Sequence, residues 1–560
     1  MQEGIHRMEQ FINYIKSLYD QASLPVVVSK IHKEEIMLPC ADGVRLRTQY
    51  FLPERICPAP TVVIRSCYPH QEPMLLIQAE AYAKRGFGFV LQWCRGTGGS
   101  EGEWEPNVHD RADGLCLMHA LQQDDRIGPI GYLGDSYLAF TGWVMADAVP
   151  EKVKTMILGV YGCDRHTSAY KDGLFRQDIL TAWAMGNAGR KVDADYMESA
   201  AYRPQVEVDE ALWGGKLSWY RDWITNTDLD SAYWSSGFWK ELRDIPGKIR
   251  IPLFIKEGWY DHHLGSALNT YYHLLSKESR AHTTVQIGPW NHGYRPAITH
   301  QDLSHLTDDS VDTPMLWFDR ILRKGEVPEA AVRQYVIGAD CWREYKVEDA
   351  PATETVRFWL DDKTLCDAPS PESGSVSYVY DPADPVLSYG AESLFSTMQK
   401  VGSLEQPEPD WRPDVKSFLS APLTQSLEIH GSINVKLFVQ TDAEDTSFTA
   451  KLMEVFPDGT AVNIRGSITT LAYRNGRTKR GMYTPGEIVE INIDMWDIAW
   501  KTQPGSRLRL DVSSSDFPQY AVHPNLPGVW SMIKETRPAE ETVWFGASYP
   551  SCIELPVIKE

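Results

Sequence analysis

The sequence lacks the features that mark several classes of protein. No stretch of its 560 residues approaches the roughly 18 consecutive apolar residues of a membrane span, and the N-terminal segment has no apolar run of the kind found in secretory signals. The nine cysteines stand singly, and no two form a C-x-x-C pair. A disulfide framework or a zinc site is therefore disfavoured, and we expect a cytoplasmic protein with reduced thiols and no membrane association.

Positive charge is also in deficit. The chain has 55 Lys and Arg against 76 Asp and Glu, a formal net charge of −21. Binding to nucleic acid needs a basic surface, so nucleic acid is not an expected partner. Hydrophobic residues make up 43% and charged residues 23%, which are the proportions of a globular protein. Tryptophan, with 19 residues, is abundant, but the count alone does not say whether it serves cores or pockets.

The chain is too long for one compact unit, and its length predicts two to four domains. Changes of pattern along it divide it into five segments. They are an N-terminal helix (1–25), the first part of an α/β core (26–161), a helical insertion (162–244), the second part of the core (245–349) and a β domain (350–560). The N-terminal helix is predicted from apolar residues spaced three and four apart, namely Ile5, Met8, Ile12, Ile15 and Leu18.

The fold class follows from how strands and helices alternate. Buried strands such as Thr61–Cys67 and Ile130–Leu133 alternate with helices such as Asp110–Gln122, which predicts a mostly parallel sheet covered on both faces. The alternation stops over 162–244, where six tryptophans fall in a helical pattern, and this segment is a candidate cap. After residue 350, short alternating strands separated by Asp, Gly, Pro and Asn turns predict an all-β sandwich or jelly roll.

A candidate nucleophile lies between a buried strand and a helix, in Gly134-Asp135-Ser136. Small residues at this position fit the sharp strand–turn–helix of a nucleophile elbow, G-x-S-x-G. The closing glycine is missing, because Leu138-Ala139 stands in its place. The alternative is an ordinary helix start with Ser136 as its cap.

A nucleophilic serine needs a base and an acid that orients the base. Asp261 directly follows one predicted strand and His292 follows the next. Both should lie at the carboxyl edge of the sheet, where Ser136 also lies. Individually, Asp261 could be a helix cap and His292 a loop histidine. The order Ser, Asp, His is that of α/β-hydrolases.

Two further histidines, His262 and His263, directly follow Asp261. Because adjacent side chains are expected to diverge and no third ligand is evident, we predict no metal at this position. Ser–His–Asp chemistry needs no organic cofactor either.

Four motifs, RGTGGSEGEW, GDSYLAFTGW, GWYDHHLGSAL and IGPWNHG, closely resemble those of the CocE/NonD hydrolases. This family contains cocaine esterase, α-amino acid ester hydrolases and, more distantly, X-Pro dipeptidyl peptidases. The resemblance covers about residues 30–550. It implies an α/β-hydrolase with an inserted helical cap and a C-terminal all-β jelly-roll domain of the galactose-binding-like type.

The resemblance also implies roles for individual residues. Ser136 matches the nucleophile, Asp261 the acid and His292 the base. The backbone N–H of Tyr137 and the hydroxyl of Tyr68 match the oxyanion hole, which holds the negative charge that develops on the carbonyl oxygen.

The chain departs from the family pattern where Trp93 replaces an Asp two residues before Arg95, so Arg95 is expected to lack its usual partner. We expect Trp259 and Trp290, which flank the acid and the base, to contribute to substrate binding.

Three functions remain open at this point. The first is hydrolysis of a carboxylic ester. The second is an amide- or peptide-directed hydrolase, such as an X-Pro dipeptidyl peptidase or an α-amino acid ester hydrolase or acyltransferase. The third is a catalytically dead binding protein. Cap carboxylates could bind a substrate ammonium in the second case; the candidates are Asp172, Asp178, Asp193 and Asp195. The expected partner is a small ester or amide substrate, and a homo-oligomer is possible from the sequence.

Overall fold

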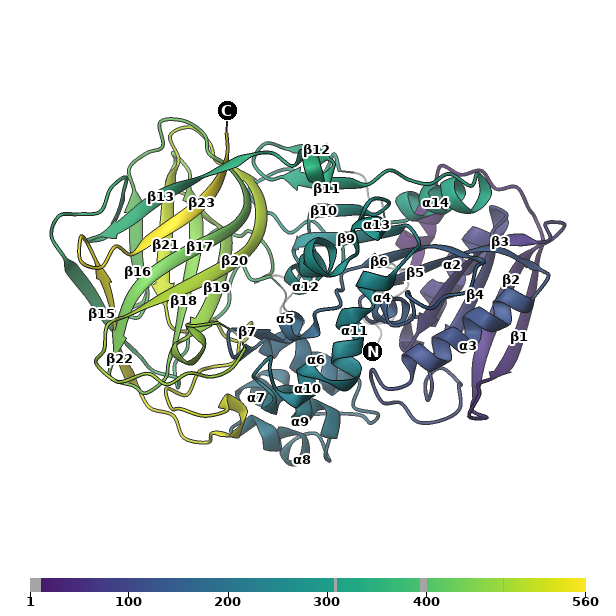
Figure 1. Ribbon diagram of the computed structural model, residues 1–560, viewed down its shortest axis with the longest axis horizontal. Coiled ribbons are helices and arrows are strands. Elements are labelled where there is room, and N and C mark those ends of the chain that lie inside the picture. The colour runs from purple at the N-terminus through teal and green to yellow at the C-terminus, as the bar shows by residue number, and fades with distance from the viewer. Residues whose placement is uncertain (1–11, 307–309, 393–399, 477, 560) are drawn as a thin grey trace.

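The computed structural model describes residues 12–306, 310–392, 400–476 and 478–559. Two sheets and a group of short helices make up the molecule (Figure 1). The first sheet is formed by strands between residues 31 and 345, and the second lies in the C-terminal β domain, green to yellow in the figure. The short helices lie beside both.

The first sheet has ten strands in the order β1-β2-β4-β3-β5-β6-β9-β10-β11-β12. The strands are β1 (Ile31–Pro39), β2 (Arg45–Pro53), β3 (Ala59–Ser66), β4 (Gly88–Trp93), β5 (Ile127–Asp135), β6 (Val153–Gly159), β9 (Leu253–Tyr260), β10 (Thr284–Asn291), β11 (Ala331–Val336) and β12 (Cys341–Tyr345). Strands β4 to β11 in this order run parallel, and antiparallel strands lie at both ends. The predicted parallel sheet is confirmed by these pairings, and within it β4, β9 and β10 are buried along their whole length.

Helices cover this sheet on both faces. They are α2 (Glu72–Lys84), α3 (Asp110–Gln123), α4 (Tyr137–Trp143), α12 (Leu264–Asn269), α13 (Lys277–Arg280) and α14 (Asp312–Phe318), with shorter turns η1 (Pro69–Gln71), η4 (Thr270–Leu274), η5 (Asp319–Arg323) and η6 (Val347–Asp349). Residues 12–20 are helical, and Ile15 and Leu18 pack with the core beneath α2 and α14. Ile5 and Met8 of the predicted N-terminal helix lie outside the described residues. None of the described helices is both long and apolar enough to cross a membrane.

Between β6 and β9 the chain forms a cluster of short helices. They are α5 (Arg165–Ala169), α6 (Gln177–Gly186), α7 (Tyr196–Ala201), α8 (Val208–Ala211), α9 (Ser218–Thr225), α10 (Ala232–Ser235) and α11 (Gly237–Asp244), with turns η2 (Gln205–Glu207) and η3 (Pro246–Lys248) and a small hairpin of β7 (Tyr170–Lys171) and β8 (Leu174–Phe175). We call this cluster the cap. Its tryptophans pack mainly on each other: the rings of Trp219 and Trp223 lie 5.0 Å apart, and Trp234 and Trp239 5.3 Å apart.

The C-terminal part is all β, as predicted. Its strands are β13 (Thr353–Asp361), β14 (Thr364–Cys366), β15 (Gly374–Tyr380), β16 (Lys416–Ser420), β17 (Glu428–Thr441), β18 (Ser447–Val455), β19 (Ala461–Thr470), β20 (Val489–Lys501), β21 (Arg507–Ser513), β22 (Ala539–Phe545) and β23 (Cys552–Ile558), with turns η8 (Leu471–Tyr473) and η9 (Trp530–Met532). Along β17 buried and half-buried residues alternate, as expected for a strand with one face on a core.

The β domain contacts the end of β9, the strand that leads to Asp261. Buried Arg465 donates a hydrogen bond to the Trp259 carbonyl at 2.6 Å, and the Tyr260 hydroxyl donates to the Ile464 carbonyl at 3.2 Å. These bonds join two segments about 200 residues apart in the chain. The β domain therefore supports the strand end on which a candidate catalytic residue lies.

Candidate active site

Ser136 occupies a sharp turn between β5 and α4. Its backbone adopts φ 57° and ψ −125°, a left-handed conformation that is strained for a residue with a side chain. A Cβ on Gly134 would lie 2.2 Å from the Leu138 carbonyl oxygen, so the turn closes only because this residue is glycine. The geometry is that of a nucleophile elbow. The missing closing glycine does not prevent it, since Leu138 and Ala139 are accommodated as buried residues.

The structure brings Ser136, His292 and Asp261 together. His292 Nε2 lies 3.0 Å from Ser136 Oγ, and His292 Nδ1 lies 2.5 Å from Asp261 Oδ2. The other carboxylate oxygen of Asp261 accepts the His263 backbone N–H at 2.7 Å. This arrangement fits an Nδ1–H tautomer of His292, in which Nδ1–H donates to Asp261 and Nε2 is left to accept the Ser136 proton.

These three residues come together because of the sheet topology. β5, β9 and β10 are parallel members of one sheet, and each candidate residue directly follows the end of its strand. The carboxyl ends of parallel strands lie at one edge, where α/β proteins place their sites. Asp261 is fully buried, and the side chain of His292 is 14% exposed.

The rings of Tyr68 and Tyr137 lie 6.5 Å apart, next to the nucleophile. Tyr137 is the first residue of α4, and the first backbone N–H groups of a helix have no partner within the helix. Tyr68 follows β3, and its hydroxyl oxygen accepts a 2.8 Å hydrogen bond from Trp183 Nε1 in the cap. Burial raises the pKa of Tyr68 well above its ordinary value, so the phenol keeps the proton that it would donate to an oxyanion.

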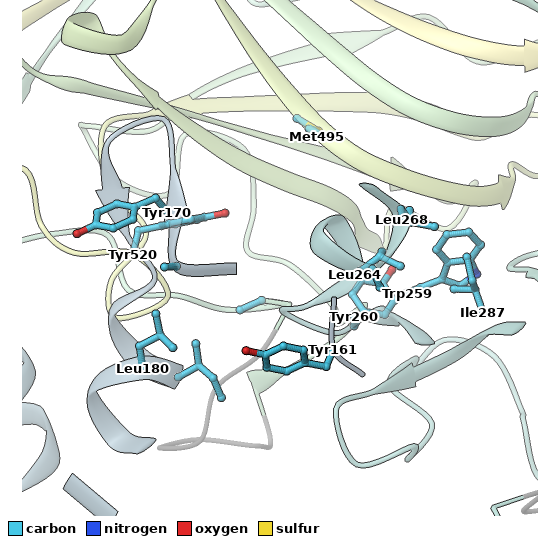
Figure 2. Packing of buried hydrophobic residues seen from close by; sticks show 14 of the residues in the cluster. Tyr161, Tyr170, Leu180, Trp259, Tyr260, Leu264, Leu268, Ile287, Met495 and Tyr520 are labelled. Atoms are coloured by element: carbon cyan, nitrogen blue, oxygen red, sulfur yellow. The ribbon is translucent and has the colours of Figure 1, made fainter. Parts of the chain in front are cut away.

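Ser136 lies between two cavities of different size. The inner cavity, of about 30 Å³, is enclosed by the cap and the histidine cluster; its lining residues are Asn107, Ser136, Tyr137, Tyr161, Arg165, Ile179, Leu180, Trp183, Trp223, His262, His263 and His292. The outer groove has a volume of about 670 Å³ and also includes Tyr68, Asn187 and Tyr294. In Figure 2 the hydroxyl end of Tyr161 points towards Leu180, across the region that contains the inner cavity.

His262 and His263 correct one expectation from the sequence. Their rings do not diverge: the ring centroids lie 4.0 Å apart, and His262 lies 4.4 Å from His292. Ligand-type atoms of Asp261, His262 and His292 fall within 4.8 Å of one another. Both nitrogens of His292 are engaged by Ser136 and Asp261. The expectation that the two side chains diverge is therefore wrong. The absence of a metal stays a prediction.

Two tryptophans expected at the substrate site do not line either cavity beside Ser136. Trp259 is fully buried and donates its Nε1–H to the Tyr335 carbonyl at 2.7 Å. Figure 2 shows it among other core residues, beside Leu264 and Ile287. Trp290 is 6% exposed and donates to the Glu257 carbonyl at 2.8 Å. Proximity along the chain was misleading, because both side chains are buried away from the two cavities.

Arg95 also differs from expectation, because it does not lack partners. Its guanidinium binds Asp113 through two nitrogens, at 2.7 and 3.2 Å, and Asp42 at 2.6 Å. Trp93, which replaces the family's Asp, is fully buried. The positive charge is balanced from other elements, and the substitution therefore leaves no unpaired arginine.

Sequence reasoning missed several residues around the nucleophile. Trp183 was expected only as one of the cap aromatics, and Arg165, Tyr161 and Asn107 were not singled out. Arg165 and Tyr161 follow the end of β6, at the same edge of the sheet as the other site residues. Their position after a parallel strand could therefore have predicted that these two residues lie near the site. No sequence signal indicates that Trp183 contacts Tyr68.

Two family models match the chain. The model for X-Pro dipeptidyl-peptidase (S15 family) matches residues 42–294, and the model for the X-Pro dipeptidyl-peptidase C-terminal non-catalytic domain matches residues 323–554. The chain is thus similar to X-Pro dipeptidyl-peptidases of the S15 family over two successive segments. It is a serine hydrolase, and the resemblance to the CocE/NonD hydrolases is confirmed.

Relatives and solved structures agree with this similarity. The chain is 29% identical to the cocaine esterase of Rhodococcus sp. (strain MB1 Bresler), over 94% of this chain and 98% of that protein. It is similar to an aminopeptidase from a marine sediment Thaumarchaeota archaeon (TM-score 0.81, 21% identity, 96% and 99% of the two chains). It is also similar to an α-amino acid ester hydrolase (TM-score 0.79, 22% identity, 96% and 99%). At these identities the two structures show the shared fold.

Proposed function

We propose that the chain hydrolyses carboxylic esters through an acyl-enzyme formed on Ser136. The observation that carries this proposal is the hydrogen-bonded series from Asp261 through His292 to Ser136, at 2.5 and 3.0 Å, on a strained turn that opens to two cavities. The similarity to an esterase over 94% of the chain supports the choice of an ester.

In the proposed reaction, His292 Nε2 takes the proton of Ser136 Oγ as the oxygen attacks the carbonyl carbon. The negative charge that develops on the carbonyl oxygen receives hydrogen bonds from the Tyr68 hydroxyl and the Tyr137 backbone N–H. Collapse of this intermediate breaks the bond to the alkoxide, which takes the proton from His292. Water then repeats the sequence on the acyl-enzyme and releases the acid. Asp261 holds His292 in the Nδ1–H tautomer and stabilises its cation.

An amino-ester hydrolase or a dipeptidyl peptidase has to bind a substrate ammonium, which calls for a carboxylate near the nucleophile. Among the described residues that line the two cavities, Asp135 is the carboxylate, and it accepts a hydrogen bond from Tyr294 at 2.6 Å. The four cap carboxylates considered from the sequence are not among the described residues that line these cavities. Asp195 caps α7 and Asp193 pairs with Lys191 on the surface. This favours an ester without an ammonium over the two alternatives.

Covalent labelling tests the nucleophile. A fluorophosphonate probe should label the wild-type chain at Ser136 and leave Ser136→Ala unlabelled, while exposed Ser235→Ala serves as a matched control that labels normally. Turnover of a p-nitrophenyl ester should be lost in Ser136→Ala. Parent-level hydrolysis by that variant would contradict the assignment.

A second assay decides between ester and peptide substrates. We expect the wild-type chain to turn over an aryl ester much faster than an X-Pro-anilide when both are assayed side by side. The reverse order would overturn the ester proposal and leave the nucleophile in place.

We also propose a reducing, cytoplasmic location. All nine cysteines are free, and five of them are buried. Thiol titration after rapid alkylation should therefore find every cysteine reduced in the protein from its native source, and a disulfide would contradict this location.

A further inference from the structure

The inner cavity contains an arginine that the proposed mechanism does not use. Arg165 begins α5, beyond the end of β6, and is 8% exposed. Its guanidinium lies over two aromatic rings, 5.8 Å from the centroid of Tyr161 and 5.0 Å from that of Trp223. All three residues line the cavity next to Ser136 and His292. The aromatic faces hold the cation in place.

Within the described part of the chain, no carboxylate lies within ion-pair distance of this charge. Among the ion pairs of 4.0 Å or less in the described chain, none involves Arg165, and none of the described residues lining the inner cavity is acidic. By contrast, the other deeply buried arginines of this region, such as Arg95 and Arg176, pair with carboxylates. A buried charge without an ionic partner is costly, which points to a partner supplied from outside the chain.

The neighbouring histidines do not supply negative charge and do not add positive charge. Burial, followed by the nearby Arg165 guanidinium, lowers the pKa of His263 well below its ordinary value. Burial also lowers the pKa of His262, with further contributions from the adjacent histidines and then from nearby arginines. Both imidazoles are therefore neutral near pH 7, and among the described residues that line this cavity Arg165 carries a permanent positive charge.

The cavity sizes indicate which part of a substrate meets Arg165. The leaving alcohol has to depart while the acyl group is still bound to Ser136, so the alcohol belongs in the larger groove of about 670 Å³. The acyl group then occupies the inner cavity. With a volume of about 30 Å³, it has room for only two or three water-sized groups, which suits a short chain.

We propose that the inner cavity binds a short acyl group ending in a carboxylate, with Arg165 as its ionic partner. The preferred substrates are then half-esters of short dicarboxylic acids. This inference rests on the proposed ester hydrolysis and names its substrate class. A guanidinium is well suited to the task, because it binds a carboxylate through two parallel hydrogen bonds.

Three ethyl esters with the same leaving group test the proposal. They are monoethyl succinate, which carries a carboxylate, ethyl pentanoate, which is neutral, and ethyl β-alaninate, which carries an ammonium. For the wild-type chain we expect kcat/KM to decrease in that order. In Arg165→Gln, kcat/KM for monoethyl succinate should fall roughly 10- to 100-fold, the usual size of a charged hydrogen-bonded contact, while that for ethyl pentanoate stays within about threefold.

Controls separate charge recognition from packing. Arg165→Lys keeps the charge and should retain part of the preference, whereas Arg250→Gln removes a surface arginine on the far side of the hydrolase core and should change nothing. Equal losses on the charged and neutral esters in Arg165→Gln would overturn the inference, as would a wild-type preference for the ammonium ester.

A binding measurement tests the anionic subsite separately from the proposed ester hydrolysis. Succinate should raise the unfolding temperature of the wild-type chain and not that of Arg165→Gln. If none of the esters were hydrolysed but this difference persisted, the ester function would be wrong and the anionic subsite would stand. If the neutral ester were hydrolysed but succinate stabilised both proteins equally, the subsite would be wrong and the function would stand.

Discussion

At the scale of single residues, the site depends on hydrogen bonds that join the cap to the hydrolase core. The Tyr68 hydroxyl belongs to the core, and the indole that donates to it, Trp183, belongs to the cap. The Trp183 ring also stacks on Tyr137, with centroids 5.6 Å apart and planes 18° apart. One cap residue thus contacts both residues proposed for the oxyanion hole.

Tyr68→Phe removes the proposed oxyanion donor while keeping the ring. We expect kcat for a p-nitrophenyl ester to fall roughly 10²–10³-fold, the usual loss for one such donor, with KM changed little because the ground-state contacts remain. Steady-state kinetics measures the two parameters separately. A rise in KM with kcat unchanged would show that Tyr68 is only a wall of the pocket.

Trp183→Phe removes the N–H that orients the Tyr68 phenol. One neutral hydrogen bond contributes about 0.5–1.5 kcal/mol, so we expect kcat to fall about 2- to 10-fold with fluorophosphonate labelling retained. Trp219→Phe is the matched control, because Trp219 packs against Trp183 with centroids 5.9 Å apart and is not part of either cavity. Equal effects of the two substitutions would mean that cap packing alone is being measured.

The candidate triad could be predicted from the sequence. The residues that surround it could not, because their positions depend on packing between distant segments. Ser136, Asp261 and His292 each follow a buried strand, and parallel topology alone brings such positions to one edge. The directions of Trp259 and Trp290 depend on which face of the strand meets the core. Arg165 and Trp183 depend on how irregular cap helices pack, and that information is not contained in any local pattern.

At the scale of elements, the turn from β5 to α4 is the most constrained feature of the site. Gly134→Ala would place a methyl group against the Leu138 and Ala139 backbone, with the nearest atom at 2.2 Å. Overpacking of this kind typically costs about 1–3 kcal/mol. We expect a lower unfolding temperature and loss of fluorophosphonate labelling. Gly186→Ala, in the cap, meets nothing within 4 Å and should keep both properties.

A buried acid on β22 makes the stability of the β domain depend on pH. Glu541 is fully buried and accepts a 2.7 Å hydrogen bond from Thr446, and burial raises its pKa to about 8. The folded state therefore keeps a proton that the unfolded chain, with a carboxyl pKa near 4.5, has released. Stability from this group is fully present below about pH 4.5 and is lost as the pH rises to about 8.

Glu541→Gln should remove this dependence, because the amide is neutral at every pH and can still accept the bond from Thr446. Unfolding temperatures measured from pH 5 to pH 9 should show the variant more stable than wild type above pH 8, with a difference that shrinks towards pH 5. Glu540→Gln, exposed on the same strand, is the control. A constant difference across the range would contradict the role of Glu541 protonation.

At the scale of the whole molecule, the fold class was predictable from the sequence and the contacts between its parts were not. The sequence pattern changes from long buried strands to a helical segment and then to short alternating strands. This change can be recognised from the sequence alone. β1 was missed because it is an edge strand, half-buried and charged, in IHKEEIMLP. The contacts of Arg465 and Tyr260 across the domain boundary join residues about 200 positions apart, and no local pattern reports them.

A buried charge cluster ties the cap, the core and the β domain together. Glu392 accepts from Arg176, which precedes α6 of the cap, at 2.9 Å, and it lies 3.5 Å from Arg465 of β19. Arg465 in turn binds the Trp259 carbonyl, two residues before Asp261. Each of the three side chains is at most 6% exposed. One carboxylate thus balances two buried cations at the meeting point of three parts of the chain.

Glu392→Gln leaves those two arginines without their anion. Removing one partner of a buried ion pair typically costs about 3–5 kcal/mol, so we expect a clearly lower unfolding temperature in calorimetry. Because Arg465 also supports the strand end before Asp261, kcat should fall as well, while KM for a neutral ester stays close to that of wild type. Exposed Glu408→Gln in the same domain is the matched control for loss of one negative charge. An unfolding temperature unchanged from wild type would mean that water, rather than Glu392, satisfies these arginines.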